Sequence, residues 1–264
     1  MAQVDGVAAL TLESRLAEAL ALLQSRLARR VQACEPLEGG LTNHSWRLQT
    51  DSGPIVLRLS GGRERELGID RVSELAALEA AAQAGLGPRV LLAEPDWGIL
   101  VTTAAAGGPW SPADAVEPRN LLRIARWFAA LHALATPAGL HSLSMRQGLA
   151  DLALALARSG IDPVPERLYE LADRQCQRLD DLAERAFCHN DAHHLNVIDD
   201  GSALVVVDWE YAAVAEAVVD LAEYAVAHGL DAQRSAALLG HYRDAGGNAD
   251  TPVFEAACWL AAFR

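Results

Sequence analysis

The sequence has 264 residues, of which 51% are hydrophobic and 22% are charged, so the chain can bury a sizeable core and its composition argues against disorder. Its 22 basic residues are all arginine, and against 35 acidic residues they give a formal net charge of -13. This charge repels phosphate backbones and disfavours a general nucleic-acid binder, although a local group of arginines could still hold one nucleotide.

The cysteines and the apolar segments exclude further classes of protein. Four cysteines are widely spread and include no Cys-x-x-Cys pair, which argues against a structural zinc site and against a disulfide-stapled secreted domain. The N-terminus has no basic start followed by an apolar run, and the uncharged stretch 97–113 is broken by glycine and proline. We therefore expect a soluble, cytoplasmic protein with no membrane partner.

The first hundred residues predict a small sheet with one inserted helix. Residues 10–30 carry leucines at helical spacing and predict an amphipathic helix. Three strands joined by tight connections follow, over residues 31–37, 44–50 and 55–59. A helix over 71–84 and two further strands, over 89–93 and 99–103, come next. A polar stretch over 61–70 lies between the third strand and this helix.

The segment 104–118 is rich in glycine and proline and nearly uncharged, which predicts a boundary between two lobes, 1–104 and 105–264. The second lobe is mainly helical, with helices predicted over 119–134, 147–159, 165–185, 218–228, 231–245 and from 252 onward. A short β region over 187–207 interrupts them. The fold class is therefore α+β, with an antiparallel sheet and helix in the first lobe and a helical second lobe.

The β region of the second lobe carries the chemistry. Asp191 is followed five residues later by Asn196 on one polar loop, and an apolar strand then delivers Asp208 at its end. Phosphoryl transfer needs a carboxylate that orients a hydroxyl nucleophile and oxygen ligands for Mg²⁺. These three residues supply both, in the order found in the protein-kinase template.

The first lobe should supply a clamp for phosphates. Arg58 is the only cation on the third predicted strand. Because its neighbours on the strand are apolar, its charge needs an anionic partner from another element. Glu74 and Glu79 on the next helix are the two candidate partners. The loop with Gly39, Gly40, Leu41, Thr42 and Asn43 lies between two strands, where backbone amides can approach phosphates.

Taken together, these segments resemble the choline/ethanolamine kinase family and its bacterial thiamine kinase relatives, within the aminoglycoside-phosphotransferase superfamily. The resemblance covers roughly residues 30 to 245 and rests on four segments, 39–43, 56–59, 188–196 and 207–211. It implies the two-lobed protein-kinase-like fold. It also implies an ATP-dependent kinase that phosphorylates a hydroxyl group of a small molecule, with ATP and Mg²⁺ as cofactors.

The resemblance assigns a role to each motif residue. Asp191 is implied to be the catalytic base, and Asn196 and Asp208 the Mg²⁺ ligands. Arg58 and Glu74 are implied to position the phosphates, with ATP under residues 39–43 and its base against the connection 99–106. His189 and Asp220 are implied to support the catalytic loop. The acceptor is expected to be a cation such as choline, ethanolamine or thiamine, near Trp209, Glu210 and Tyr211.

Other interpretations stay open at this point. The chain could phosphorylate an aminoglycoside or a sugar, or could be a nucleotide-binding member of the fold without catalysis. A metal-dependent hydrolase using His189, His193 and His194 is a third possibility, and Asp220 could simply cap a helix. Residues 212–217 depart from the family pattern, so the sequence does not determine the shape of the loop near the acceptor site. It also determines neither the acceptor nor the oligomeric state.

Overall fold

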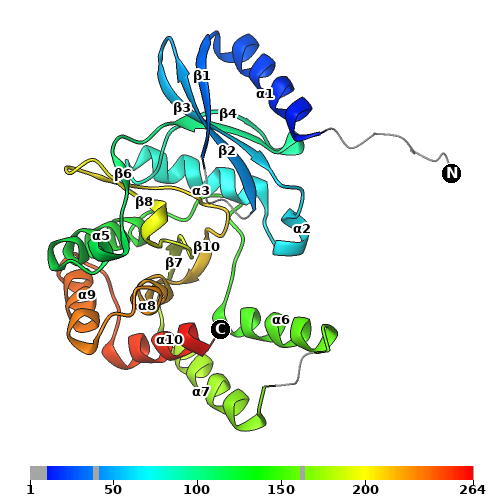
Figure 1. Ribbon diagram of the computed structural model, residues 1–264. Coiled ribbons are helices and arrows are strands. Elements are labelled where there is room, and N and C mark those ends of the chain that lie inside the picture. The colour runs from blue at the N-terminus through cyan, green and yellow to red at the C-terminus, as the bar shows by residue number, and fades with distance from the viewer. Residues whose placement is uncertain (1–10, 38–41, 161–163, 264) are drawn as a thin grey trace. The chain divides into compact units, whose positions relative to one another are not determined.

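The chain divides into two units, which the computed structural model describes over residues 11–37, 42–160 and 164–263 (Figure 1). The first unit comprises the residues up to Arg71 together with Pro88–Ala104, and the second comprises Val72–Gly87 and the residues from Ala105 onward. The segment 72–87 therefore groups with the helical unit, whereas we predicted it within the sheet lobe 1–104.

The first unit is built on a five-stranded antiparallel sheet with the strand order β1-β2-β3-β5-β4. Its strands are β1 (Val31–Leu37), β2 (Asn43–Thr50), β3 (Gly53–Ser60), β4 (Val90–Glu94) and β5 (Ile99–Thr103). The helix α1 (Leu12–Leu27) precedes them, and the short helices α2 (Glu64–Leu67) and η1 (Pro95–Trp97) lie in the connections. The strands agree with the predicted meander, and α2 lies in the polar stretch 61–70, where the sequence predicted no helix or strand.

The core of the first unit lies on one face of this sheet. Ile55, Leu57 and Leu59 alternate along β3 and are fully buried, as the period of two in a half-buried strand requires. Ala19 and Leu23 of α1 belong to the same apolar cluster. The helix begins where the Thr11 side chain accepts a hydrogen bond from the amide of Ser14. Burial of its apolar stripe holds α1 on the sheet.

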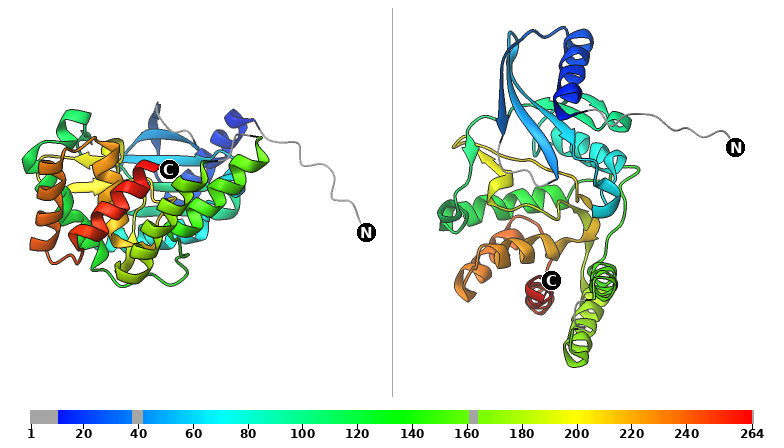
Figure 2. Two further views of the ribbon diagram at one scale, coloured as in Figure 1. Left: turned by 90° about the horizontal axis from the view of Figure 1, so that it is seen from below. Right: turned by 45° about the vertical axis from the view of Figure 1, so that its right-hand side comes forward.

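The second unit is mainly helical, and its longer helices agree with the predicted segments to within a few residues. They are α3 (Arg71–Gln83), α5 (Pro118–His132), α6 (Met145–Arg158), α7 (Glu166–Leu182), α8 (Ala217–Ala227), α9 (Ala232–Asp244) and α10 (Thr251–Phe263). Helix α10 packs on α8 and α7, and α5 packs on α9. Helices α6 and α7 lie side by side (Figure 1, Figure 2).

Two small sheets lie among these helices and carry the candidate site. The strand β7 (Arg185–Cys188) pairs with β10 (Ala213–Glu216), and the order of the other sheet is β6-β8-β9. Its strands are β6 (Gly108–Pro109), β8 (Val197–Asp199) and β9 (Leu204–Val206). The sequence did not predict β6, β10 or the short helix α4 (Pro112–Ala115), because two to four small residues carry no periodic signal.

Helix α8 packs beneath these sheets and forms much of the core of the second unit. Eight of its residues are buried, so the helix is apolar on nearly all sides, as expected of a core helix. Among the described residues, none of the helices combines the length and the apolar character that a bilayer span requires.

Candidate functional site

The loop after β7 holds Asp191 and Asn196 against each other. It follows the buried strand end at Cys188 and closes with the single turn η2 (His194–Asn196). The side-chain Nδ2 of Asn196 donates to the backbone carbonyl of Asp191 at 2.9 Å and to its carboxylate Oδ2 at 3.2 Å. This contact directs the amide nitrogen toward Asp191 and the amide oxygen away from it.

Asp208 lies next to this loop because β8 and β9 form a hairpin. Val197 pairs with Val206, and the amide of Val207 donates to the carbonyl of Asn196 at 2.9 Å. Asp208 is the following residue and takes a left-handed backbone conformation with φ 66°. That conformation is uncommon for a residue other than glycine and is found where the surrounding structure fixes the chain.

The donor set around the hairpin fits a magnesium ion. Asn196 offers an amide oxygen and Asp208 a carboxylate, and hard divalent cations such as Mg²⁺ prefer oxygen ligands of these types. Asn196 is buried, and its amide is oriented by Asp191. Oriented oxygen atoms of this kind are what a small, geometrically demanding ion requires.

Asp220 of α8 braces the loop 189–196, the predicted catalytic loop, from below. Its carboxylate accepts the backbone amides of His189 at 2.9 Å and Asn190 at 2.7 Å. It does not cap its own helix, which begins after Glu216. The brace continues on the far side, where Nε2 of His132 lies 3.1 Å from Asp220 and Nδ1 of His132 lies 2.8 Å from the hydroxyl of Tyr242.

The buried Asp220 is held as an anion. Burial raises the pKa of its carboxyl group, but the hydrogen bonds from His132 and from the amide of His189 outweigh that effect, and the net pKa lies below the ordinary value. A charge in this position is tolerated because each of its oxygens accepts a donor.

His189 fastens the loop to the hairpin. Its Nδ1 accepts the amide of Asp191 at 3.2 Å, and its Nε2 donates to the carbonyl of Val207 at 3.1 Å. Burial lowers the pKa of this histidine to about 4, so the ring is neutral at physiological pH and one nitrogen donates while the other accepts. Both nitrogens therefore serve the backbone, and His189 is a structural support rather than a metal ligand.

The neighbouring histidines also have polar partners within the protein. Nδ1 of His193 accepts the amide of Leu195, and Nδ1 of His194 lies 3.2 Å from Nε2 of His228. With the ring of His189 engaged as well, this arrangement does not favour the hydrolase hypothesis, which needs histidine nitrogens that face a common metal ion.

The carboxyl group of Asp191 has a pKa raised to about 6. Burial is the largest cause, and the nearby carboxylates of Glu210 and Asp220 raise the pKa further against the lowering effect of the Asn196 hydrogen bond. A carboxylate with a pKa near the working pH is suited to accept a proton from a substrate. Asp191 therefore has the electrostatic environment expected of a catalytic base.

The predicted residues of the first unit lie around its central strand. Arg58 is half-buried in β3, opposite Ser45 on one side and Leu100 on the other. Gly39 and Gly40 lie outside the described residues. Asn43, expected in the loop, begins β2, and its side chain donates to Thr42 and accepts from Arg71.

Glu74 and its rival Glu79 differ in burial. Glu74 is 3% exposed on α3, whereas Glu79 is exposed on the same helix. A buried carboxylate needs compensating groups, and a solvated one does not. This favours Glu74 as the partner of Arg58, but the two residues belong to different units and their pairing stays a prediction.

The three residues expected near the acceptor differ in environment. Trp209 is 1% exposed, its Nε1 donates to the carbonyl of Val206, and its ring packs 4.6 Å from the ring of His189. It is a core residue, so its burial does not suit the predicted contact with an acceptor. Glu210 is also buried, and the carbonyl of Tyr211 accepts the side-chain amide of Asn190 at 2.9 Å.

Sequence reasoning missed His132, Asn190 and Tyr242. The contacts of His132 lie 88 and 110 residues further along the chain, so no local pattern reveals them. Asn190 takes a left-handed conformation with φ 60° and lies within the catalytic motif. Its position between His189 and Asp191 was the one available signal, because asparagine tolerates this conformation better than most residues.

Comparison with known proteins assigns the chain to a family. The sequence matches the model of the phosphotransferase enzyme family over residues 33–258. No curated protein sequence is similar enough to count as a match.

Solved structures share the fold. The chain is similar to a choline/ethanolamine kinase family protein from Mesorhizobium loti, with 27% identity, a TM-score of 0.72, and coverage of 94% of this chain and 83% of that one. The choline kinase LicA from Streptococcus pneumoniae has 20% identity and a TM-score of 0.75, covering 94% and 88%. The macrolide 2'-phosphotransferase MphH from Brachybacterium faecium has 20% identity and a TM-score of 0.68, covering 91% and 87%.

These findings confirm the predicted fold class and the predicted resemblance. The sheet unit and the helical unit are those of the protein-kinase-like fold. Because the family model spans most of the chain, the protein belongs to the phosphotransferase enzyme family.

Proposed function

We propose that the protein is an ATP-dependent small-molecule kinase that transfers the γ-phosphate of ATP to a hydroxyl group of a small cationic acceptor. The observation that carries the proposal is the contact of Asn196 with the carboxylate of Asp191, with Asp208 next to the backbone partner of Asn196. This is the grouping that phosphoryl transfer needs, namely a base and two oxygen ligands on one loop and the hairpin that follows it.

Asp191 acts as the base in this proposal. At neutral pH its carboxyl group is ionised, because the pH exceeds its pKa of about 6. The carboxylate orients the acceptor hydroxyl and takes its proton as the oxygen attacks phosphorus. Asp220 and His189 keep the backbone of the base in place through the amides that they bind.

Asn196 and Asp208 would hold Mg²⁺, which when bound neutralises the negative charge of the triphosphate. Arg58 would bind phosphate oxygens, supported by Glu74, and the backbone of residues 39–43 would approach the phosphates. The base of ATP would contact the connection that includes Ala105 and Ala106. A structure of LicA in complex with AMP, 19% identical to this chain, supports the use of an adenine nucleotide.

A cationic acceptor is the substrate class that the charges favour. The net charge of -13 attracts cations at long range, and Glu210 lies close enough to raise the pKa of Asp191. Choline, ethanolamine and thiamine meet this description. The similarity to macrolide phosphotransferases supports a second candidate, a larger antibiotic or sugar acceptor.

An assay of ATP consumption over a panel of amino alcohols, thiamine, aminoglycosides, macrolides and sugars tests the proposal. With the best acceptor, we expect Asp191→Asn to lower kcat by about a thousandfold, because the base can no longer take the proton. Asp181→Asn makes the same chemical change on the exposed face of α7 and should leave kcat unchanged. Full turnover by Asp191→Asn would refute the assignment, and Mg·ATP binding without transfer to any acceptor would favour a non-catalytic protein.

A further inference from the structure

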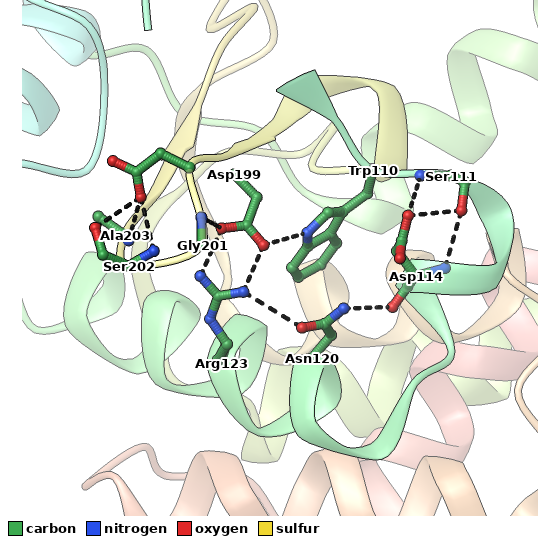
Figure 3. A network of polar contacts seen from close by, with 10 residues as sticks. Trp110, Ser111, Asp114, Asn120, Arg123, Asp199, Gly201, Ser202 and Ala203 are labelled. Carbon is green, nitrogen blue, oxygen red and sulfur yellow. Dashed lines mark hydrogen bonds and ion pairs between the residues drawn. The ribbon is translucent and has the colours of Figure 1, made fainter. Parts of the chain in front are cut away.

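Asp199 joins three segments of the second unit at one carboxylate (Figure 3). Arg123 of α5 donates to it through both terminal nitrogens, at 2.7 Å to Oδ1 and 2.5 Å to Oδ2. Nε1 of Trp110 donates to Oδ2 at 2.9 Å, and the amide of Gly201 donates to Oδ1 at 2.7 Å. The carboxylate therefore ties the connection around Trp110 and helix α5 to the β8–β9 turn.

Arg123 is itself oriented by its surroundings. Its guanidinium donates to the side-chain oxygen of Asn120 at 3.3 Å, and the side-chain nitrogen of Asn120 donates to the carbonyl of Asp114 at 3.0 Å (Figure 3). The hydrogen bonds from Arg123 hold the pKa of Asp199 far below its ordinary value, so the ion pair persists throughout the physiological range. A two-donor contact of this kind fixes direction as well as distance.

The connection also approaches β8 very closely. Gly107 has φ 87°, and a Cβ added there would lie 1.9 Å from the carbonyl oxygen of Asp199, so a larger residue does not fit. Gly108 then pairs with Asp199 and Pro109 with Ile198, and the amide of Trp110 donates to the carbonyl of Val197 at 3.1 Å. The connection from 107 to 110 thus runs along the whole length of β8.

The strand β8 begins directly after Asn196 and ends at Asp199. Its three residues span about 10 Å in extended conformation. One end of the strand therefore adjoins the proposed metal ligand, and the other end adjoins the connection that follows Ala105 and Ala106. The proposed phosphate contact and the proposed base contact of the nucleotide therefore lie at the two ends of one short strand.

We infer that Asp199 is a positioning residue which, through Arg123 and Trp110, fixes the connection 105–110 to β8 and so sets the affinity of the site for the base of the nucleotide. The inference rests on the proposed function, which places the base against the connection 99–106, whose last residues are Ala105 and Ala106. Asp199 contacts neither the phosphates nor the acceptor in this scheme. Its loss should weaken binding of the base and leave the phosphate end unchanged.

The first test is Asp199→Asn in the full chain. An amide in this position turns an NH₂ group toward the donors of Arg123 and Trp110, so one of its oxygen acceptors is lost. We expect the Kd for ADP, measured by calorimetry without acceptor, to rise by roughly tenfold. The KM for ATP should rise in parallel, whereas kcat should stay within about twofold of the original value. Inorganic tripolyphosphate, which has no base, should inhibit the variant and the original protein equally.

Two milder variants and one control complete the test. Arg123→Lys keeps the charge but loses the two-donor geometry, and Trp110→Phe keeps the ring but loses one donor, so each should raise the Kd for ADP less than Asp199→Asn does. If Asp199→Asn does not fold, the Kd values of these two variants for ADP test the inference in its place. Arg146→Gln removes the ion pairs of another arginine that has two aspartate partners in the same unit, and it should leave the Kd for ADP unchanged.

The outcomes separate this inference from the proposed function. If the original protein binds ADP and Asp191→Asn is inactive, but a folded Asp199→Asn binds ADP normally, the inference alone is wrong. An equal loss of affinity for tripolyphosphate, or a fall in kcat as large as the rise in KM, would also overturn it. If the original protein binds no adenine nucleotide, both proposals fail.

Discussion

The loop 189–196 and the helix pair α6–α7 belong to the same unit, and aspartate side chains hold both in place. The aspartate beneath the loop is buried, whereas those of the helix pair are exposed to solvent. Asp220 beneath the loop is buried and accepts three donors, two of them backbone amides. Between the two helices, Arg146 binds Asp173 and lies 2.7 Å from Asp180, with all three side chains more than a third exposed.

This difference separates a rigid part of the molecule from an adaptable one. Around Asp220 the loss of any partner leaves a buried polar group without a hydrogen bond, so the loop has one stable arrangement. On the helix pair, water replaces a lost partner at little cost. Leu154 on α6 and Leu182 on α7 are 50% and 67% exposed, which indicates sparse packing there. Asp191 and Asn196, the proposed base and a proposed metal ligand, lie on the loop in the rigid part.

The largest expected effect comes from Asp220→Ala. Because it leaves the amides of His189 and Asn190 and the ring of His132 without their acceptor, we expect the free energy of unfolding to fall by about 3 to 5 kcal/mol. Urea denaturation measures this loss. The activity of the protein that remains folded should also fall, since the backbone that carries Asp191 is no longer held.

Asp231→Ala is the matched control for this variant. Asp231 also accepts a backbone amide, that of Arg234, but as an exposed cap at the start of α9. Its loss should cost about 1 kcal/mol and leave activity unchanged. Equal losses of stability in the two variants would show that burial does not distinguish the two carboxylates.

A second, intermediate effect concerns pH. Since the base must be ionised and the pKa of Asp191 is about 6, kcat should fall about tenfold per pH unit well below pH 6. Glu210→Gln removes a neighbouring negative charge that raises this pKa, so it should move the acid limb of the profile to lower pH. An acid limb near pH 4 in the original protein would contradict the assigned environment.

The same raised pKa predicts a stability effect of opposite sign. Between the ordinary value of 3.8 and about 6 the folded state binds more protons at Asp191 than the unfolded state does, so stability falls as pH rises through this range. Asp191→Asn should therefore stabilise the protein at pH 8, by about 1 kcal/mol after allowance for partial exposure, and not at pH 3. Thermal melts at both values test it.

Much of the fold followed from local patterns. The strand β3 alternates between buried and less buried residues after an initial glycine and proline, and the long helices carry apolar residues at helical spacing, which the sequence displays directly. The strand β10 has four residues and forms by pairing with β7. The helix α2 also has four residues, none of them buried. Such short elements have no periodicity of their own, so only the assembled chain reveals them.

The candidate site divides in the same way. Asp191 and Asn196 lie on one loop, and Asp208 follows the β8–β9 hairpin that comes directly after it. The three residues are close in sequence, so the sequence could group them as one motif, and their roles stay predictions. His132 contacts Asp220 across 88 residues and Tyr242 across 110, and the contact of Arg123 with Asp199 crosses 76. Trp209 follows Asp208 directly, and the turn directs its ring into the core, as is the default for tryptophan, and not toward the predicted acceptor.

The smallest expected effect is that of Arg146→Gln on the adaptable helix pair. Because the ion pairs of Arg146 with Asp173 and Asp180 are largely solvated, their loss should lower the free energy of unfolding by no more than about 1 kcal/mol. The KM for the acceptor should not change if the helix pair lies apart from the reaction. Arg146→Lys, which retains the charge, controls for any effect of net charge. A rise in acceptor KM in Arg146→Gln alone would mean that α6 and α7 form part of the acceptor site, and the contrast between a rigid functional loop and a merely peripheral helix pair would have to be given up.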